Sequence, residues 1–220
     1  MMPDNFSDDL FSKVNGDVRQ SIGAQAYILR GYALPYVNSI LTVLSTILIQ
    51  APLRHMMTPN GQKMSVAMSN CGSLGWTSSK KGYCYTQQDP ETGQDWPLLP
   101  KVFLKLAYNA AKSVGFSKFI PDACLINSYS PSTRLSLHQD RDEQDLSAPI
   151  VSVSLGIRAV FLFGGLKRKD SLQKFPIYHG DIVVWGGVDR LRYHGVLSIA
   201  ESDHPLLGKQ RINLTFRKAG

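Results

Sequence analysis

The segment Arg211-Ile212-Asn213-Leu214-Thr215-Phe216-Arg217 alternates polar and apolar side chains along its whole length. This period of two is typical of a β-strand, because successive side chains point to opposite faces of a sheet. The apolar members form one face, and Arg211, Asn213 and Arg217 share the other. Arginines on the inward face of a barrel are costly unless they meet anions. The segment therefore predicts either a strand that faces an anion, such as a dicarboxylate, or an edge strand with one solvated polar face.

Six further short runs of strand-like composition precede this segment, and turn residues separate them. Aliphatic, aromatic and β-branched residues dominate the runs, as they do in β-strands. We expect strands at residues 123–129, 135–138, 150–155, 159–163, 175–178 and 181–185. So many short strands with turns between them predict a sandwich or a barrel.

Two amphipathic helices are expected ahead of these strands. In the apolar stretch 34–53, residues such as Ile40 and Ile47 recur at helical spacing. A second helix begins at about Pro100 and stops at Gly115. The two helices can cover one face of the sandwich or barrel. Polar residues interrupt the first stretch, which is also too short to span a membrane.

The composition changes between the two helices. Gly, Ser, Thr, Asn and Pro become frequent over residues 56–97, and only 64–68 alternates like a strand. We interpret about residues 52–97 as a hairpin-rich lid. Residues 1–22 lack a consistent hydrophobic period and predict a flexible arm, which leads into a short strand at 26–29.

The length of 220 residues and the hydrophobic content of 43% are sufficient for one good core. The sequence therefore predicts a single domain, mainly β with flanking helices, whose core spans about residues 121–220. The net charge of +7 and the isoelectric point of 9.3 favour a polyanionic partner, because basic surface releases counterions from nucleic acid.

Three cysteines, Cys71, Cys84 and Cys124, are an odd number without metal-site spacing. They predict small buried apolar residues rather than a disulfide framework or a zinc site. The first ten residues have neither a basic nor an apolar region of the kind found in secretory signals. We therefore expect a protein of the reducing cytoplasm.

The segment Leu135-Ser136-Leu137-His138-Gln139-Asp140 places a histidine and an aspartate two residues apart, and hence on one face of a strand. With one more histidine, this pair would offer two imidazoles and one carboxylate to one side of a metal, which is a non-haem iron(II) arrangement. His179, His194 and His204 are the candidates for that third position. His194 is the preferred one, because His179 lies in a tight turn and His204 in a polar loop.

Several segments together resemble the AlkB family of DNA dealkylation proteins. They cover the chain from about Pro52 to its end in the family's order. The similar segments are Met64-Ser65-Val66-Ala67-Met68, Cys71-Gly72-Ser73-Leu74-Gly75-Trp76, Pro121-Asp122-Ala123-Cys124-Leu125-Ile126-Asn127, 135–140, 149–156, Phe163-Gly164-Gly165-Leu166-Lys167-Arg168, 179–187 and 213–217. Ser128 and the turn Ser132-Thr133 depart from the family's residues, which affects loop shape and surface charge.

The resemblance implies a double-stranded β-helix, or jelly-roll, core and a dioxygenase that depends on Fe(II), 2-oxoglutarate and O2. It implies His138, Asp140 and His194 as both the catalytic residues and the iron ligands. It further implies a set of residues that hold 2-oxoglutarate, which comprises Asn127, Tyr129, Arg211, Asn213 and Arg217. Guanidinium groups pair with carboxylates through two parallel hydrogen bonds, which suits that role.

The resemblance also implies which residues bind the substrate. Trp76 and Tyr83 of the lid can stack against a base turned out of its strand. Asp142 would favour cationic lesions such as 1-methyladenine and 3-methylcytosine over the neutral bases. Arg168 would contact a phosphate or a base edge. Each of these residues has an ordinary alternative, as a lid-core aromatic or a solvated surface charge.

The activity that this resemblance implies is the repair of alkylated DNA, and of RNA as well, by oxidative demethylation with release of formaldehyde. Single-stranded substrate is favoured because base flipping then costs less than in a duplex. We expect a monomer that does not associate with membranes. Two alternatives stay open: an oxygenase of the same fold that hydroxylates a protein, a lipid or a small molecule, and a binding module without catalysis.

Overall fold

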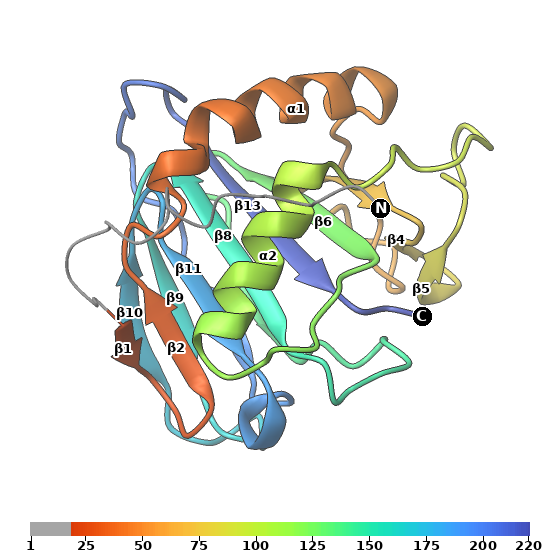
Figure 1. Cartoon of the computed structure of the whole chain (residues 1–220). Coiled ribbons are helices and arrows are strands. Elements are labelled where there is room, and N and C mark those ends of the chain that lie inside the picture. The colour runs from red at the N-terminus through yellow and green to blue at the C-terminus, as the bar shows by residue number, and fades with distance from the viewer. Residues whose placement is uncertain (1–18) are drawn as a thin grey trace, which may run out of the picture.

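The computed structural model describes residues 19–220, in which strands of three antiparallel sheets alternate with two α-helices (Figure 1). The elements before the second helix are β1 (Arg19–Ser21), β2 (Ala26–Leu29), the 3-10 turn Leu34–Tyr36, α1 (Val37–Gln50), β3 (Ala67–Gly72), β4 (Gly75–Ser79) and β5 (Gly82–Thr86). From there the order is α2 (Lys101–Ser113), β6 (Ala123–Tyr129), β7 (Leu135–His138), β8 (Ile150–Gly156), β9 (Ala159–Phe163), β10 (Gln173–Ile177), β11 (Ile182–Trp185), the 3-10 turn Gly187–Asp189, β12 (His194–Val196) and β13 (Arg211–Arg217).

The larger sheet has seven strands in the order β1-β2-β11-β8-β13-β6-β3. β13 lies between β6 and β8 and pairs with each along nearly its whole length. Because side chains alternate between the faces, Ile212, Leu214 and Phe216 point outward into an apolar core, and the polar residues of the same strand point inward. The expectation that this segment faces an interior rather than solvent is confirmed, since every residue of β13 is buried.

Both helices lie against the outer face of the larger sheet (Figure 1). Ile40, Leu44 and Ile47 of α1 and Phe103 and Leu106 of α2 are buried in the same core as the outward side chains of the sheet. Apart from Ile49 of α1, polar residues occupy the solvent side of each helix, as expected for a helix on a sheet. The two predicted helices are thus confirmed, and Gly115 follows α2 with a φ of +100°.

The smaller sheet has four strands in the order β10-β9-β12-β7 and completes a double-stranded β-helix with the larger one. Two apolar clusters fill the space between the sheets. One gathers around Phe161, Phe163 and Trp185, and the other around Met68 and Tyr129. The inward polar side chains of β6, β8 and β13 lie between the two sheets as well, so the fold positions a polar site inside an apolar frame.

The part of the lid nearest the site is the hairpin β4–β5, a separate two-stranded sheet. β3, which falls within residues 56–97, is an edge strand of the larger sheet, and isolated bridges at Met57–Lys63 and Gln88–Asp95 close short turns on either side of it. Arg54 ties two parts of this region together through a two-pronged hydrogen bond to Asp89.

Some local expectations are wrong. Arg19–Ser21 pair with β2 and Ile22 is buried, so these residues of the expected flexible arm belong to the sheet, and residues 1–18 lie outside the described part. The strand expected at 64–68 begins at Ala67, because Met64 and Met68 form backbone hydrogen bonds with the neighbouring residues 54–56 instead of one continuous ladder. Cys84 is exposed, whereas Cys71 and Cys124 are buried as expected.

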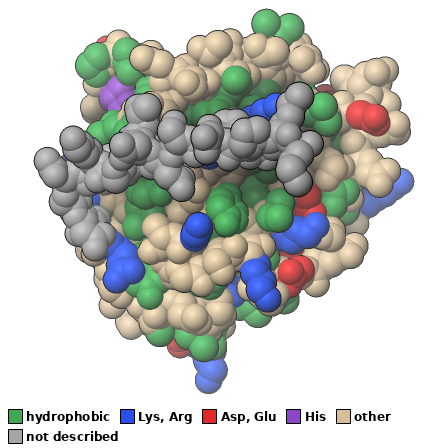
Figure 2. Space-filling model, viewed as in Figure 1, with side chains coloured by type: hydrophobic (Ala, Val, Ile, Leu, Met, Phe, Trp, Pro, Cys, Tyr) green, Lys and Arg blue, Asp and Glu red, His purple; other side chains and the backbone are tan. Residues whose placement is uncertain are grey.

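In the part of the chain that the structure describes, neither helix has the length and apolarity needed to cross a bilayer. Figure 2 shows lysine and arginine side chains spread over the face that carries α2, with few acidic side chains between them, in keeping with the positive net charge.

Candidate active site

His138, Asp140 and His194 meet at the open end of the smaller sheet. His138 is the last residue of β7 and His194 the first of β12, and the two strands pair with these histidines directly opposite each other. Asp140 follows two residues after His138, in the loop that leaves β7. The pairing of two strands therefore brings together residues that are 56 positions apart in the sequence.

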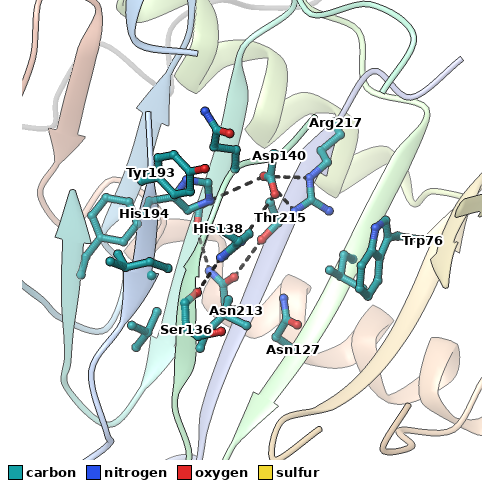
Figure 3. A pocket seen from close by; sticks show the side chains of 18 of the residues that line it. Trp76, Asn127, Ser136, His138, Asp140, Tyr193, His194, Asn213, Thr215 and Arg217 are labelled. Atoms are coloured by element: carbon teal, nitrogen blue, oxygen red, sulfur yellow. Dashed lines mark hydrogen bonds and ion pairs between the residues drawn. The ribbon is translucent and has the colours of Figure 1, made fainter. Parts of the chain in front are cut away.

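The three side chains converge on one point (Figure 3). Their nearest ligand atoms all lie within 4.8 Å of one another. Nε2 of His138 is 3.6 Å from Asp140 Oδ1, and Nε2 of His194 is 3.9 Å from Asp140 Oδ2. These separations are too long for hydrogen bonds and are suitable for three atoms around a common ion.

Backbone carbonyl groups set the tautomer of both imidazoles. Nδ1 of His138 lies 2.8 Å from the carbonyl oxygen of Ser136, and Nδ1 of His194 lies 3.0 Å from that of Arg192. A carbonyl oxygen only accepts hydrogen bonds, so each Nδ1 carries the proton and each Nε2 keeps a free lone pair. Both free lone pairs belong to the nitrogens that face Asp140.

The charge states of His194 and Asp140 are those that a metal requires. Burial, with the neighbouring His138, lowers the pKa of His194 to about 3, so this imidazole is neutral at pH 7. Burial alone would raise the pKa of Asp140, but the Arg217 guanidinium and the two imidazoles hold it well below its ordinary value. Two imidazoles and one carboxylate fit Fe(II) and leave further coordination positions open.

A second group of predicted residues lies deeper in the same cavity. Asn127 and Tyr129 from β6 face Arg211 from β13, and the Arg211 guanidinium carbon lies 4.7 Å from the centre of the Tyr129 ring. Nε of Arg211 donates to Ser154 Oγ at 3.0 Å, but its buried Nη1 has no hydrogen-bond partner among residues 19–220. Burial lowers the pKa of this guanidinium, as expected for a cation without an anion beside it.

Asn127 Oδ1 is also buried without a partner in the described structure. An unpaired buried polar atom costs about 1–3 kcal/mol, and native structures rarely contain one without a reason. Because an amide can be turned over, Asn127 can present its NH2 group to the cavity that Arg211 also lines. The two groups therefore fit a carboxylate of a bound anion such as 2-oxoglutarate.

Asn213 differs from these residues because its amide is fully used within the protein. Its Nδ2 donates to Ser152 Oγ and to the Val153 carbonyl oxygen, and its Oδ1 accepts from Thr215 Oγ1. The structure thus places Asn213 in the cavity wall, where it orients Ser152 and Thr215. Contact between Asn213 and an anion stays a prediction.

Arg217 lies next to the triad rather than next to Arg211. Its Nη2 and Nε are 2.9 and 3.1 Å from Asp140 Oδ2, and the same Nε is 3.3 Å from Glu143 Oε1. The guanidinium therefore holds the carboxylate of Asp140 from the side opposite the two imidazoles (Figure 3).

The predicted substrate residues line the mouth of the same cavity, whose volume is about 440 Å³. Trp76 and Tyr83 stack with ring centres 5.4 Å apart, and Trp76 Nε1 donates to Asp142 Oδ2 at 3.0 Å. Arg168 donates to the Leu137 carbonyl oxygen at 2.9 Å and lies over the Tyr193 ring. The structure brings all four to the lining of one cavity, whose volume is sufficient for a nucleobase.

The other two histidines considered for the third position lie elsewhere. His179 and His204 have ring centres 4.3 Å apart, and His179 Nδ1 accepts a hydrogen bond from the Gly156 amide. Neither residue lines the cavity. The choice of His194 agrees with the geometry.

The two departures from the family's residues also lie away from the cavity lining. Ser128 Oγ accepts a hydrogen bond of 2.6 Å from Gln210 Nε2. Ser132 has a φ of +69° in the turn after β6, a conformation that non-glycine residues seldom adopt.

Residues that the sequence did not single out complete the site. Ser152 and Thr215 point inward, and strict alternation along β8 and β13 was a sufficient signal for both. Glu143, Arg190 and Tyr85 form a buried polar network beside Arg217. No spacing rule links these three, because they come from separate loops and from the lid.

The comparisons with known proteins agree with this geometry. The family model described as the 2OG-Fe(II) oxygenase superfamily matches residues 25–217. The chain is 51% identical over 201 residues to "Alpha-ketoglutarate-dependent dioxygenase AlkB" of Salmonella typhimurium, which covers 91% of this chain and 93% of that protein. It is 50% identical over 202 residues to the protein of the same name from Escherichia coli, with 92% and 94% covered.

A more distant relative is "Nucleic acid dioxygenase ALKBH1" of mouse, 35% identical over 116 residues that make up 52% of this chain and 30% of that protein. Among solved structures, that of OsALKBH1 superimposes with a TM-score of 0.77 at 29% identity and covers 90% of this chain and 100% of that one. Fold, donor set and sequence similarity thus agree, and the chain belongs to the 2OG-Fe(II) oxygenase superfamily and, within it, to the AlkB family.

Proposed function

We propose that this protein is an Fe(II)- and 2-oxoglutarate-dependent dioxygenase that removes alkyl groups from damaged bases of nucleic acid. The observation that carries the proposal is a single cavity that joins a facial His-Asp-His set, a buried guanidinium whose Nη1 has no partner among the described residues, and two stacked aromatic rings. The names of the AlkB relatives and of the mouse nucleic acid dioxygenase support the same activity.

His138, Asp140 and His194 would hold the iron, and they act as ligands through the two free Nε2 atoms and the carboxylate. Arg211, with Asn127 and the Tyr129 hydroxyl, would bind a carboxylate of 2-oxoglutarate. Asn213 lies in the wall of the same cavity, and Arg217 holds Asp140 in place. Contact of Asn213 and Arg217 with 2-oxoglutarate stays part of the proposal. When bound, iron and 2-oxoglutarate supply oxidation of the N-alkyl carbon by O2, which yields succinate, CO2, an aldehyde and the repaired base.

Trp76 and Tyr83 would receive the damaged base at the mouth of the cavity. Their rings already stack on each other, so an entering base replaces one aromatic contact with another. The Asp142 carboxylate, now bonded to Trp76 Nε1, is well placed to accept a hydrogen bond from a cationic base. This arrangement supports 1-methyladenine and 3-methylcytosine, both cationic, as substrates, with formaldehyde as the aldehyde.

We further propose a single domain in which residues 52–97 serve as a substrate-recognition lid over the jelly-roll core of residues 121–220. Alkylated single-stranded DNA is the expected partner, with double-stranded DNA and RNA as further substrates. The exposed Tyr83 and the lysines Lys80 and Lys81 at the tip of the hairpin can follow a flexible strand. Residues 19–220 of one chain supply every proposed site residue, and we propose a monomer that acts in the cytoplasm.

The proposal is tested by mass spectrometry of a single-stranded oligonucleotide that carries one 1-methyladenine. The oligonucleotide is incubated with the protein, Fe(II), ascorbate and O2, with and without 2-oxoglutarate. We expect loss of one methylene mass only when 2-oxoglutarate is present, and none with His138→Ala. Formation of succinate without any loss from alkylated DNA or RNA would place the substrate among proteins, lipids or small molecules and would contradict the proposal.

A further inference from the structure

Glu143 is a buried carboxylate that the proposed chemistry does not use directly. Its side chain is 2% exposed and meets three partners at once. Oε2 is 2.9 Å from Arg190 Nη2, and Oε1 is 3.3 Å from Arg217 Nε and accepts a hydrogen bond of 2.7 Å from the Tyr85 hydroxyl. Each partner belongs to a different part of the molecule.

One partner connects Glu143 to the triad. Arg217 is held between two carboxylates, because its Nε lies near both Glu143 Oε1 and Asp140 Oδ2. The position of this guanidinium therefore depends on Glu143, and it determines in turn how Asp140 presents its oxygens to His138 and His194. Arg190 supports the same loop, since it also donates to the backbone carbonyl oxygens of Asp140 and Ala148.

Another partner connects Glu143 to the lid. Tyr85 lies on β5 of the hairpin, directly opposite Trp76 on β4. Trp76 binds Asp142, and Tyr85 binds the next residue along the chain, Glu143. Trp76 and Tyr85, which are cross-strand neighbours in the lid, are thus hydrogen-bonded to the consecutive acids Asp142 and Glu143 of the loop after Asp140.

The two hydrogen bonds differ in burial, and we therefore assign them different roles. The bond from Trp76 to Asp142 lies at the exposed mouth, where an entering base competes for both groups. The bond from Tyr85 to Glu143 is shielded, and burial raises the pKa of the Tyr85 hydroxyl, which stays a neutral donor. The exposed hydrogen bond from Trp76 to Asp142 can break when substrate enters, while the shielded one from Tyr85 to Glu143 keeps the hairpin in place.

We propose that Glu143 is a positioning residue that binds Tyr85 and Arg217 together and thereby anchors the lid hairpin β4–β5 to the loop that carries Asp140. The part that concerns Asp140 rests on the proposed role of that residue as a metal ligand. In this arrangement, the buried carboxylate of Glu143 determines both the position of the lid hairpin and the orientation of Asp140. Loss of the Tyr85 hydroxyl would loosen the hairpin and disturb the metal site together, although Tyr85 does not line the cavity.

The test uses Tyr85→Phe, which keeps the ring and removes only the hydroxyl. Tyr178→Phe is the matched control, because Tyr178 is 47% exposed in a turn far along the chain from the lid. Hydrogen–deuterium exchange of residues 75–86 is measured in the metal-free proteins, and the dissociation constant of Mn(II) is measured by titration calorimetry. Glu143→Gln, which still accepts from Tyr85 but loses its charge toward Arg217, is treated in the same way.

We expect Tyr85→Phe to accelerate exchange in residues 75–86 by about tenfold or more and to weaken Mn(II) binding severalfold, with no such change in Tyr178→Phe. Glu143→Gln should weaken Mn(II) binding and alter exchange in the hairpin less than Tyr85→Phe does. Unchanged exchange in the hairpin, equal acceleration throughout the chain, or unchanged Mn(II) affinity in Tyr85→Phe would each overturn the proposal. None of these measurements needs a nucleic acid, so failure of the proposed substrate would leave them readable.

Discussion

At the scale of single residues, the site is defined by polar atoms that lack a hydrogen-bond partner within residues 19–220. Arg211 Nη1 and Asn127 Oδ1 are buried without hydrogen bonds in the described chain, and both imidazoles of the triad turn a free lone pair toward Asp140. Unsatisfied groups of this kind are costly in a core and become favourable when a ligand binds. The kind of ligand can therefore be inferred from these groups: a carboxylate fits Arg211 and Asn127, and a metal ion fits the triad.

Arg211→Lys should weaken binding of 2-oxoglutarate by between about tenfold and a hundredfold. A lysine keeps the charge but cannot present two parallel N–H groups to a carboxylate, and a hydrogen bond to a charged group contributes about 1.5–3 kcal/mol. The measurement is the KM for 2-oxoglutarate from succinate formation. The control is Arg158→Lys, at an exposed arginine outside the cavity lining. An unchanged KM for Arg211→Lys would remove Arg211 from the 2-oxoglutarate site.

Asp142→Asn should reduce the preference for cationic lesions. The carboxylate attracts the positive charge of 1-methyladenine, and an amide of the same shape does not. We expect kcat/KM for 1-methyladenine to fall by about tenfold relative to a neutral etheno adduct in the same oligonucleotide. Glu201→Gln, at an exposed surface acid, is the control. An equal fall for both lesions would show that Asp142 acts on the lid tryptophan and not on the charge of the base.

The metal-free protein should lose stability as the pH falls through the weakly acidic range. His194 has a pKa of about 3 in the folded protein and about 6.5 as a free side chain, so the unfolded chain binds one more proton between these values. The free energy of unfolding from this group is retained above pH 6.5 and decreases toward pH 3, by at most about 1.4 kcal/mol per pH unit. Urea unfolding at several pH values measures the slope, and His194→Gln should reduce it. An identical slope in His194→Gln would contradict the assignment.

At the scale of elements, alternation and helical spacing are strong enough in this sequence to predict most strands and both helices. β6, β7 and β9 have the expected bounds, because each is a run of strand-forming residues with turn residues at both ends. β12 was not predicted, since it has three residues and is a strand only through its pairing with β7 and β9. β1 was missed for the same reason. Pairing between distant segments is decided by the tertiary structure and leaves no local pattern.

The site residues that could be predicted belong to local patterns, whereas the others meet only through the tertiary structure. The pair His138 and Asp140 is visible as a spacing within one strand, and the face of β13 as an alternation. The network around Glu143 depends on Tyr85, Arg190 and Arg217, which meet only after the lid has folded onto the core. Contacts of this kind have no periodicity, so only the structure reveals them.

Packing of α1 on the larger sheet should contribute to stability and not to the site. Ile40→Ala removes a fully buried side chain and should lower the free energy of unfolding by about 2–5 kcal/mol. Ile49→Ala, on the same helix at 81% exposure, should change it by less than about 0.5 kcal/mol. Denaturant unfolding measures both. A similar effect of the two variants would contradict the placement of α1.

At the scale of the whole molecule, the fold both keeps a polar site inside an apolar frame and lets a nucleic-acid strand approach. The apolar clusters on both sides of the polar interior hold the two sheets together around the site, and the exposed Lys80 and Lys81 lie at the tip of the lid hairpin, where a charged strand can approach. The net charge of +7 should make binding of single-stranded DNA weaken steeply with salt. Fluorescence titrations at several salt concentrations should give a negative linear slope of log affinity against log salt. A flat dependence would exclude phosphate contacts as the main source of affinity.

The most direct test of the central claim is to count products in one reaction with an oligonucleotide that carries 1-methyladenine. Succinate, formaldehyde and repaired adenine are measured in the same samples over time. If this cavity couples 2-oxoglutarate oxidation to dealkylation, the three products form in equal amounts, and all of them disappear in His138→Ala. Repair without succinate, or succinate without formaldehyde when the lesion is present in excess, would contradict the account.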